Sequence, residues 1–412
     1  MSRVLQSDSS SREGKHVWSK DAKFALMLNK FIVWPLGLWP LECDDAFSRF
    51  RNFYAVVSQV WMIGTQATAA YLGCGDVADT VDFVMMTACA LMALSKIVTI
   101  RLHMSKVHTV FVSALDDWLA VDVDKSRDVL IPFAKTGRFV FYLQMVSAYM
   151  SNTLIIIGAL PFLIPPAANG TWANVSETLQ SRQLPMRTGC MFAGYRDEIY
   201  GSLYVYESVM IMITAHGNVG CDVLFFILAM HLCGQIELLK TDVLKIGEDE
   251  KVPGEWKNKI VECVHRHIRL LGMAKALNKV VSGVLVIQLL LNAGLNLMLG
   301  IRMLIEIKRG SIFNAVRPMI GFNVLMLQLY LLSYASDRLS SQAESILDAV
   351  YDSYWYKLPA KLRRDLYFVT MRANKPIYFM AGHFYAMNIE NFMNILKASF
   401  SYFSILRIMF QA

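Results

Sequence analysis

The sequence is poor in charged residues, which make up 18% of its 412 positions. Soluble domains usually carry about 25% charged residues, so the deficit favours a chain that is partly surrounded by lipid. Uncharged runs of roughly 18 residues or more recur along the chain, which is the length needed to cross about 30 Å of hydrocarbon. The composition therefore predicts an all-α membrane protein rather than two or three soluble domains.

Motifs that carry chemistry are also lacking. The seven cysteines are scattered without a C-x-x-C pair, which argues against a zinc or redox site. No G-x-S-x-G, Walker loop, H-E-x-x-H or EF-hand pattern occurs, so we expect no enzyme, and no cofactor or metal. His265 and His267 lie two residues apart and do not share a helix face, which favours structural or solvated roles. The net charge of +7 comes without a basic and aromatic stripe, so nucleic-acid binding is not expected.

Seven hydrophobic segments predict seven transmembrane helices. They span residues 53–72, 83–100, 139–165, 199–236, 280–301, 318–336 and 387–409. Lys96, near the end of the second segment, is expected to snorkel towards the membrane surface. The stretch 31–41, FIVWPLGLWPL, is too short to span, and its prolines and tryptophans suit a segment at headgroup level, with a core loop as the alternative.

The orientation follows from the distribution of positive charge. Most Lys and Arg residues lie in the N-terminus and in the loops after the second, fourth and sixth helices, which predicts an intracellular N-terminus and an extracellular C-terminus. Two N-x-[ST] sequons, at Asn169 and Asn174, fall in a loop that this topology places outside, so both are candidate glycosylation sites. Cys74 and Cys190 would also lie outside, and whether they pair stays open.

Two of the loops predicted to be cytoplasmic, those after the fourth and sixth helices, have helical character. Cys263, Arg266, Leu270 and Ala274 recur at helical spacing after the fourth membrane helix, and residues 336–372 have a similar pattern. We therefore divide the chain into a cytoplasmic N-terminus with an interfacial segment, six membrane helices, cytoplasmic assembly helices and a last membrane helix. These regions span residues 1–48, 49–336, 337–386 and 387–412. An aromatic-rich segment below a membrane domain suits subunit contacts. The candidate assembly residues are Arg266, Tyr351, Trp355 and Leu366.

Two carboxylates interrupt the apolar fourth helix. Ionisable groups inside a membrane usually face a bundle interior or a wet cavity. Glu207 either lines a pocket or bonds a neighbouring helix, and Asp222 either does the same or lies near the cytoplasmic interface.

The last helix has a stripe that begins polar and ends apolar. Its members fall at alternating spacings of four and three residues: Asn394, Ala398, Ser401, Ile405 and Ile408. Such a face suits a water-filled pore closed by a hydrophobic constriction, and a packing stripe is the alternative. Arg407 should point away from this face.

The segment 371–407, MRANKPIYFMAGHFYAMNIENFMNILKASFSYFSILR, resembles the C-terminal signature of insect odorant receptors. Further upstream, 222–235 resembles the end of that family's fourth helix, CVHRH at 263–267 the run before its fifth, and YDSYWYKLP at 351–359 the part after its sixth. Gustatory receptors share that fold but usually end in T-Y-x-x-x-L-x-Q-F, whereas here Tyr402 is followed by Phe403 and Arg407.

The resemblance implies seven helices and a heteromeric, odorant-gated cation channel of sensory neurons, a heterotetramer with a shared co-receptor. The modest loop after the fourth helix fits a tuning subunit better than the co-receptor. An odorant is expected among the outer halves of the second, third, fourth and sixth helices. The candidate pocket residues are Met85, Cys89, Met150, Thr153, Tyr200, Tyr204, Ser208, Phe322 and Met326. The rival classes are a G-protein-coupled receptor, which lacks support from D-R-Y-like and N-P-x-x-Y motifs, and a transporter, for which internal repeats are missing.

Overall fold

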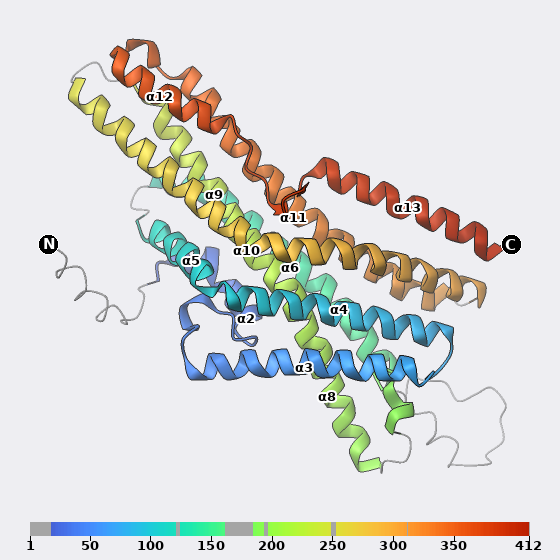
Figure 1. Cartoon of the computed structure of the whole chain (residues 1–412). Coiled ribbons are helices and arrows are strands. Elements are labelled where there is room, and N and C mark those ends of the chain that lie inside the picture. Colours follow the sequence, from blue (N-terminus) through green and yellow to red (C-terminus); the bar gives the residue numbers. More distant parts are fainter. Residues whose placement is uncertain are drawn as a thin grey trace, which may run out of the picture.

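Long helices dominate the computed structural model, which describes residues 18–120, 124–160, 184–192, 197–248, 253–310 and 312–411. The seven predicted membrane segments all fall on helices, so the all-α, seven-helix architecture is confirmed (Figure 1). These are α3 (Ala46–Tyr71), α4 (Val77–Leu102), α6 (Asp124–Gly158), α8 (Asp197–Ala215) continued by α9 (Cys221–Leu244), α10 (Pro253–Lys308), α11 (Ile312–Asp352) and α13 (Ile389–Gln411). Within the described residues, strands are limited to the short pair β1 (Met380–Ala381) and β2 (Tyr385–Ala386), just before α13.

Five helical runs in the described chain are long and apolar enough to cross a membrane. They lie in α4, α6, α8 with α9, α10 and α11. The other two, α3 and α13, have 26 and 23 residues and so exceed the length needed to span about 30 Å of hydrocarbon. Their lower hydropathy comes from polar positions: Gln59 and Gln66 are buried in α3, and Lys397 and Arg407 lie in α13.

The later helices extend well past the membrane-spanning lengths. α10 has 56 residues and α11 has 41, and α12 (Ala360–Ala373) folds back beside them. In Figure 1 these extensions meet at the upper left, which we call the α12 end. The α3–α4 turn, the α10–α11 turn and the end of α13 lie at the opposite end, on the right. The predicted helical continuations of the later helices are confirmed.

A disulfide joins Cys74, in the α3–α4 turn, to Cys190, in the short helix η3 (Thr188–Phe192) that precedes α8. The two Cα atoms are 5.9 Å apart. This answers the pairing that the sequence left open, and we call this side of the molecule the disulfide end. The sequons at Asn169 and Asn174 lie outside the described residues.

The N-terminal segment packs into the protein. It forms α1 (Lys20–Leu26), η1 (Met27–Asn29), α2 (Lys30–Val33) and η2 (Pro40–Glu42). Ile32, Leu36, Leu38 and Trp39 are all buried, so the alternative of a core loop describes their environment. Trp39 meets Phe111 edge-on at a ring-centroid distance of 5.0 Å.

Phe111 belongs to α5 (Met104–Leu119), a helix that our sequence analysis missed. It follows α4 after a break at His103. Its buried residues have clear helical spacing: Val107, Val110, Phe111, Ala114, Leu115 and Trp118. The periodic signal was therefore present, but a polar loop was expected between the second and third membrane helices.

Helix α9 is the centre of the bundle. It packs against α11, α6 and α10, and a continuous run from Cys221 to Ile236 is buried on every face. A helix that is apolar all round fits a site surrounded by protein. Asp222 therefore lies in the interior rather than near the cytoplasmic interface.

Lys96 of α4 neutralises Asp222. The Lys96 Nζ atom lies 2.7 Å from Asp222 Oδ2, and both side chains are almost fully buried. Lys96 also donates to the backbone oxygen of Asn218 at 3.2 Å, and Gln288 of α10 donates to Asp222 at 3.5 Å. The expectation that Lys96 snorkels is wrong, because an ion pair inside the bundle satisfies the ammonium group instead.

A π-helical turn, His216–Gly220, joins α8 to α9 and was not predicted. Two glycines let this turn approach its neighbours closely. A Cβ atom at Gly220 would lie 2.3 Å from Ile32 Cγ2, and one at Gly217 would lie 3.0 Å from Ala93 Cβ. The turn brings the Asn218 carbonyl to Lys96, so it belongs to the same buried polar group.

We expect Lys96→Met to destabilise the protein by about 3–5 kcal/mol, because it leaves the Asp222 carboxylate buried without its cation. The double variant Lys96→Met with Asp222→Leu should recover most of this loss. Lys30→Met is the matched control, since Lys30 pairs with Glu42 at a partly exposed site and should cost no more than about 1 kcal/mol. Thermal unfolding of purified protein measures all three, and equal losses for Lys96→Met and Lys30→Met would contradict the interpretation.

A candidate ligand cavity

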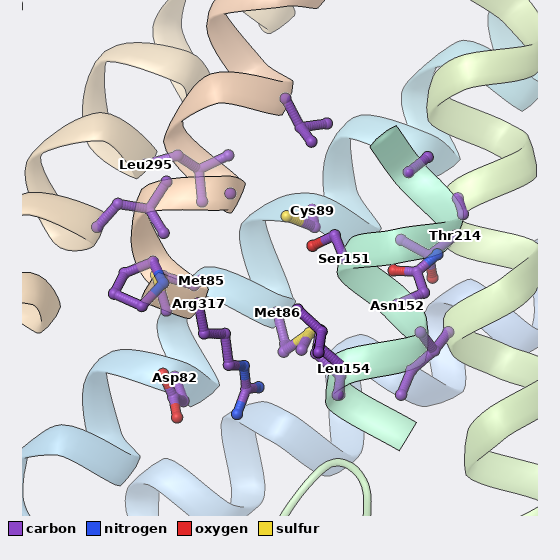
Figure 2. Close-up of a pocket in the computed structure, with 18 of the residues that line it drawn as sticks. Asp82, Met85, Met86, Cys89, Ser151, Asn152, Leu154, Thr214, Leu295 and Arg317 are labelled. Atoms are coloured by element: carbon purple, nitrogen blue, oxygen red, sulfur yellow. The ribbon is translucent and has the colours of Figure 1, made fainter. Parts of the chain in front are cut away.

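A cavity of about 400 Å³ lies between the helices, on the side of the Lys96–Asp222 pair that faces the disulfide end. Its walls come from α4, α6, the α8–α9 junction, α10 and α11, with Met62 from α3 (Figure 2). Small-molecule pockets in proteins commonly measure 300–1,000 Å³, so this volume suits one small ligand.

The middle of the cavity is apolar. Methionines from α4 face aliphatic residues from α6, α10 and α11 across the space (Figure 2). Methionine is unbranched and polarisable, and it adapts to ligands of different shape. The apolar lining includes Met62, Met85, Met86, Met92, Leu154, Ile155, Leu295, Leu299 and Leu325.

The floor of the cavity, towards the α12 end, is polar but uncharged. Asn218 and Gln328 line it, and their side-chain oxygens lack hydrogen-bond partners in the described structure. The Asn218 amide donates to the Cys89 backbone oxygen at 3.1 Å. Higher on the wall, Asn152 also has an amide nitrogen without a partner. These groups can hydrogen-bond a polar atom of a ligand or water.

Charged residues surround the cavity at the disulfide end. Asp82 lies 3.2 Å from Arg302 and 3.7 Å from Arg187, and Arg302 also pairs with Glu306 at 2.6 Å. The Arg317 side chain extends from α11 into the same space (Figure 2). The cavity therefore has a charged rim, an apolar middle and an amide floor.

Further ion pairs contact the rim residues from outside the cavity. Arg187 pairs with Asp79, and Arg309 pairs with Asp76 and lies 3.6 Å from Glu306. The backbone N–H of Asp79 and then Arg309 lower the pKa of the Asp76 carboxyl, so that it stays ionised at neutral pH. Asp76 and Asp79 also form a capping box that begins α4.

Comparison with known proteins decides the family. The family model described as 7tm Odorant receptor matches residues 76–400, which is most of the chain. The chain belongs to the odorant receptor family. Of the alternatives left by the sequence, the odorant receptor prediction is confirmed, rather than the gustatory or G-protein-coupled receptor class.

Individual relatives are distant but extend along the chain. Odorant receptor Or1 of Anopheles gambiae is 23% identical over 411 residues, which covers 91% of this chain and 93% of the relative. Odorant receptor 2a of Drosophila melanogaster is 22% identical, and that alignment covers 50% of this chain and 55% of the relative. The solved structure of the olfactory receptor OR5 from Machilis hrabei superposes with a TM-score of 0.71 at 13% identity, over 93% of this chain and 99% of the other. At that identity the superposition shows a shared fold.

Two of the nine predicted pocket residues of this odorant receptor, Met85 and Cys89, line the cavity. Tyr204 and Ser208 line a more open apolar groove of about 450 Å³ between α6 and α8, where the Tyr204 hydroxyl donates to the Ile156 backbone oxygen at 2.6 Å. The rings of Tyr200 and Tyr204 are tilted by 42° relative to each other, with their centroids 6.2 Å apart.

The other predicted pocket residues lie one position from residues that do line the cavity. Met150 and Thr153 are exposed on α6, next to Ser151 and Asn152. On α11, Phe322 and Met326 follow Gly321 and Leu325 in the same way. Phe322 packs instead against Phe400 of α13 at 6.1 Å, and Met326 is buried in the core. These residues therefore lie at the same level of α6 and α11 as the cavity but on other faces of the two helices, and their role in a ligand pocket stays a prediction.

Glu207, which could have lined the pocket, bonds the segment before α8 instead. Its carboxylate accepts a hydrogen bond from the Met186 backbone N–H at 2.9 Å and another from the Thr188 hydroxyl. Two histidines in the same helix run, His216 and His231, have structural partners as well. His216 contacts the Tyr149 hydroxyl at 3.2 Å, and His231 contacts Asp117 at 3.1 Å.

All five members of the predicted pore stripe are exposed on α13: Asn394, Ala398, Ser401, Ile405 and Ile408. The opposite side of α13 packs on the receptor, where Phe403 and Leu406 reach Gly300 of α10. The stripe therefore faces away from its own subunit. Arg407 is exposed too, but it is turned by about 140° from the centre of the stripe at 100° per residue.

The four predicted assembly residues divide into two groups. Tyr351 and Trp355 are exposed at the α12 end, with 78% and 38% of their surfaces accessible. Arg266 is partly exposed and pairs with Asp242 at 2.5 Å. Leu366 is buried inside its own subunit, so it could support a contact surface only by fixing α12.

We expect Cys89→Leu to narrow the cavity and to discriminate between ligands by size. A methylene group in an apolar pocket is worth about 1–3 kcal/mol, so the half-maximal concentration should rise about tenfold for a large ligand relative to a small one. Met150→Leu is the control, because Met150 is exposed on the outer face of α6 and both ligands should be unaffected. Dose–response curves for a homologous series measure the effect. Equal shifts for all ligands would point to altered gating or folding.

Proposed function

We propose that this chain is the odorant-binding subunit of a heteromeric, odorant-gated cation channel, assembled with the shared co-receptor in the plasma membrane of olfactory sensory neurons. The observation that carries the proposal is the cavity of about 400 Å³, which has an apolar middle and lies between the helices of an odorant receptor fold. A structure of the Machilis hrabei receptor is of its complex with eugenol, a small aromatic molecule. The cavity described here has a volume of about 400 Å³, within the range that is common for small-molecule pockets.

The orientation proposed from the sequence assigns a role to each end of the molecule. The disulfide end would face outside, where oxidising conditions favour the Cys74–Cys190 bond. The α12 end would then be cytoplasmic, in agreement with the positive charge of its loops. Ligands would enter the cavity from the charged rim or through the membrane.

Subunit association would involve two regions, the α12 end and helix α13. At the α12 end, the exposed Tyr351 and Trp355 offer the aromatic surface that is typical of interface cores. Within the membrane, the exposed stripe of α13 would face a central pore formed jointly by four subunits. Cations would pass along Asn394 and Ser401 to a constriction at Ile405.

The proposal is tested by expressing the chain with and without an odorant co-receptor and applying a panel of volatile molecules. We expect at least one volatile to evoke a cation current only in the co-expressing cells. Because the ligand occupies a finite number of sites, the response should also saturate with concentration, and it arises only if the ligand binds the open state more strongly. Saturating currents from this chain alone would contradict the heteromeric part of the proposal, and a second-messenger response without current would contradict the channel itself.

We expect Ile405→Ser to raise the basal current or alter ion permeability without changing odorant selectivity. A narrow apolar ring blocks ions because it cannot hydrate them, and a hydroxyl relieves that barrier. Arg407→Ala is the control on the same helix, and its current should resemble the wild type. Co-receptor subunits supply the other walls, so the current is measured at a fixed expression ratio. If Arg407→Ala changes leak and permeation while Ile405→Ser does not, a different face of α13 lines the pore.

A further inference from the structure

More arginines than carboxylates line the rim of the cavity. Three arginines, Arg187, Arg302 and Arg317, line the cavity, and Asp82 is the one carboxylate among the described lining residues. The carboxylates of Asp79 and Glu306 pair with two of these arginines but do not line the cavity. A ligand in the cavity therefore meets more cationic than anionic groups at this end.

Arg317 differs from the other two arginines in having no ionic partner among the residues that the structure describes. Arg187 pairs with Asp79, and Arg302 pairs with both Asp82 and Glu306. Among the described residues, no carboxylate lies within 4.0 Å of the Arg317 guanidinium. Figure 2 shows the side chain extending into the cavity, with Asp82 on one side and Met86 and Leu154 on the other.

A partly buried guanidinium without an anion is incompletely solvated. Taking a charge out of water is costly unless a partner replaces the lost hydration. A guanidinium presents two parallel N–H groups that match the two oxygens of a carboxylate, and such charge-assisted pairs are stronger than neutral hydrogen bonds. Arg317 carries such a guanidinium, and its side chain points into a cavity whose volume suits a small ligand.

The rest of the wall specifies the body of that ligand. Met85, Met86, Leu154 and Leu299 make the middle of the cavity apolar, so an alkyl chain or a ring is favoured there. The charged rim, with Arg317, lies at one end of this apolar middle. A ligand that uses both regions has an apolar body and one terminal anionic group.

We propose that this cavity recognises apolar carboxylic acids, and that Arg317 binds their carboxylate at the rim. This inference rests on the proposed function, since it assigns a ligand class to the proposed ligand cavity. Carboxylic acids with unperturbed pKa values are ionised at neutral pH, so the bound species is the anion. Arg187 and Arg302 stay paired with Asp79, Asp82 and Glu306, which leaves Arg317 as the lining guanidinium that is available to a ligand.

An internal partner is the competing explanation for the position of Arg317. The Oδ2 atom of Asp82 lies 3.7 Å from Arg187 and accepts no hydrogen bond. If Arg317 turned to this oxygen, the guanidinium would be neutralised within the protein and would close the rim rather than bind a ligand. The two explanations differ in whether an acid binds more tightly than its uncharged ester.

The test compares straight-chain carboxylic acids from hexanoic to decanoic acid with their methyl esters. Binding to the purified full-length chain is followed as a ligand-induced rise in unfolding temperature, which needs neither gating nor the co-receptor. Currents from the chain co-expressed with its co-receptor are the second measurement. The variants are Arg317→Met, Arg317→Lys and the control Arg309→Gln, since Arg309 is paired with Asp76 and does not line the cavity.

For the wild type we expect each acid to bind more tightly than its ester. Arg317→Met should weaken acid binding about ten- to hundredfold and leave the ester unchanged, because a hydrogen bond to a charged group contributes about 1.5–3 kcal/mol. Arg317→Lys should retain part of the preference, and Arg309→Gln should retain all of it. If Arg317→Met does not fold, the acid and ester comparison in the wild type and in Arg317→Lys still decides.

Equal binding of acids and esters to the wild type would overturn the proposal, as would an acid preference that survives in Arg317→Met. If neutral volatiles bind and open the channel while acids do neither, the ligand class is wrong and the proposed function stands. If no ligand of either kind binds or opens the channel, the proposed function fails together with this inference.

Discussion

The Lys96–Asp222 ion pair is the constraint on which the middle of the receptor depends. A buried charge that loses its partner is strongly destabilising, so α4 and α9 must keep the register that holds the two atoms 2.7 Å apart. Gln288 ties α10 to the same carboxylate, and the π-helical turn supplies the Asn218 carbonyl. Because Asn218 also lines the cavity, the ion pair fixes the floor on which a ligand would rest.

Helices α10 and α11 connect this cavity with α13. Leu299 lines the cavity, and its neighbour Gly300 contacts Phe403 of α13. On α11, Gly321 lines the cavity and Phe322 packs on Phe400 of α13. A ligand that separates α10 from α11 would therefore move the surfaces on which α13 rests. Such a ligand would gate the proposed channel only if it bound better to the displaced arrangement of the helices.

Sequence reasoning found the helices because crossing hydrocarbon requires long apolar runs, but it could not find their inner faces. On α6 and α11 the predicted Met150 and Phe322 are neighbours of the lining residues Ser151 and Gly321. Protein interior and lipid are both apolar, so apolar residues face either environment and the helical period is weak. The pairing of Lys96 was missed for a related reason: its partner is 126 residues away, and only the fold brings the two together.

The α13 stripe shows the opposite situation. Its polar start at Asn394 and Ser401 contrasts with the packed side at Phe403 and Leu406, so the two faces differ in chemistry and the period is visible in the sequence. A face can be read from sequence when its environment differs in chemistry from that on the other side, and in the proposed pore water would supply this difference. Arg317 was not among the predicted pocket residues, because it stands just before the apolar run 318–336 and so resembles a charged loop residue. Only the fold shows that its side chain points into the cavity.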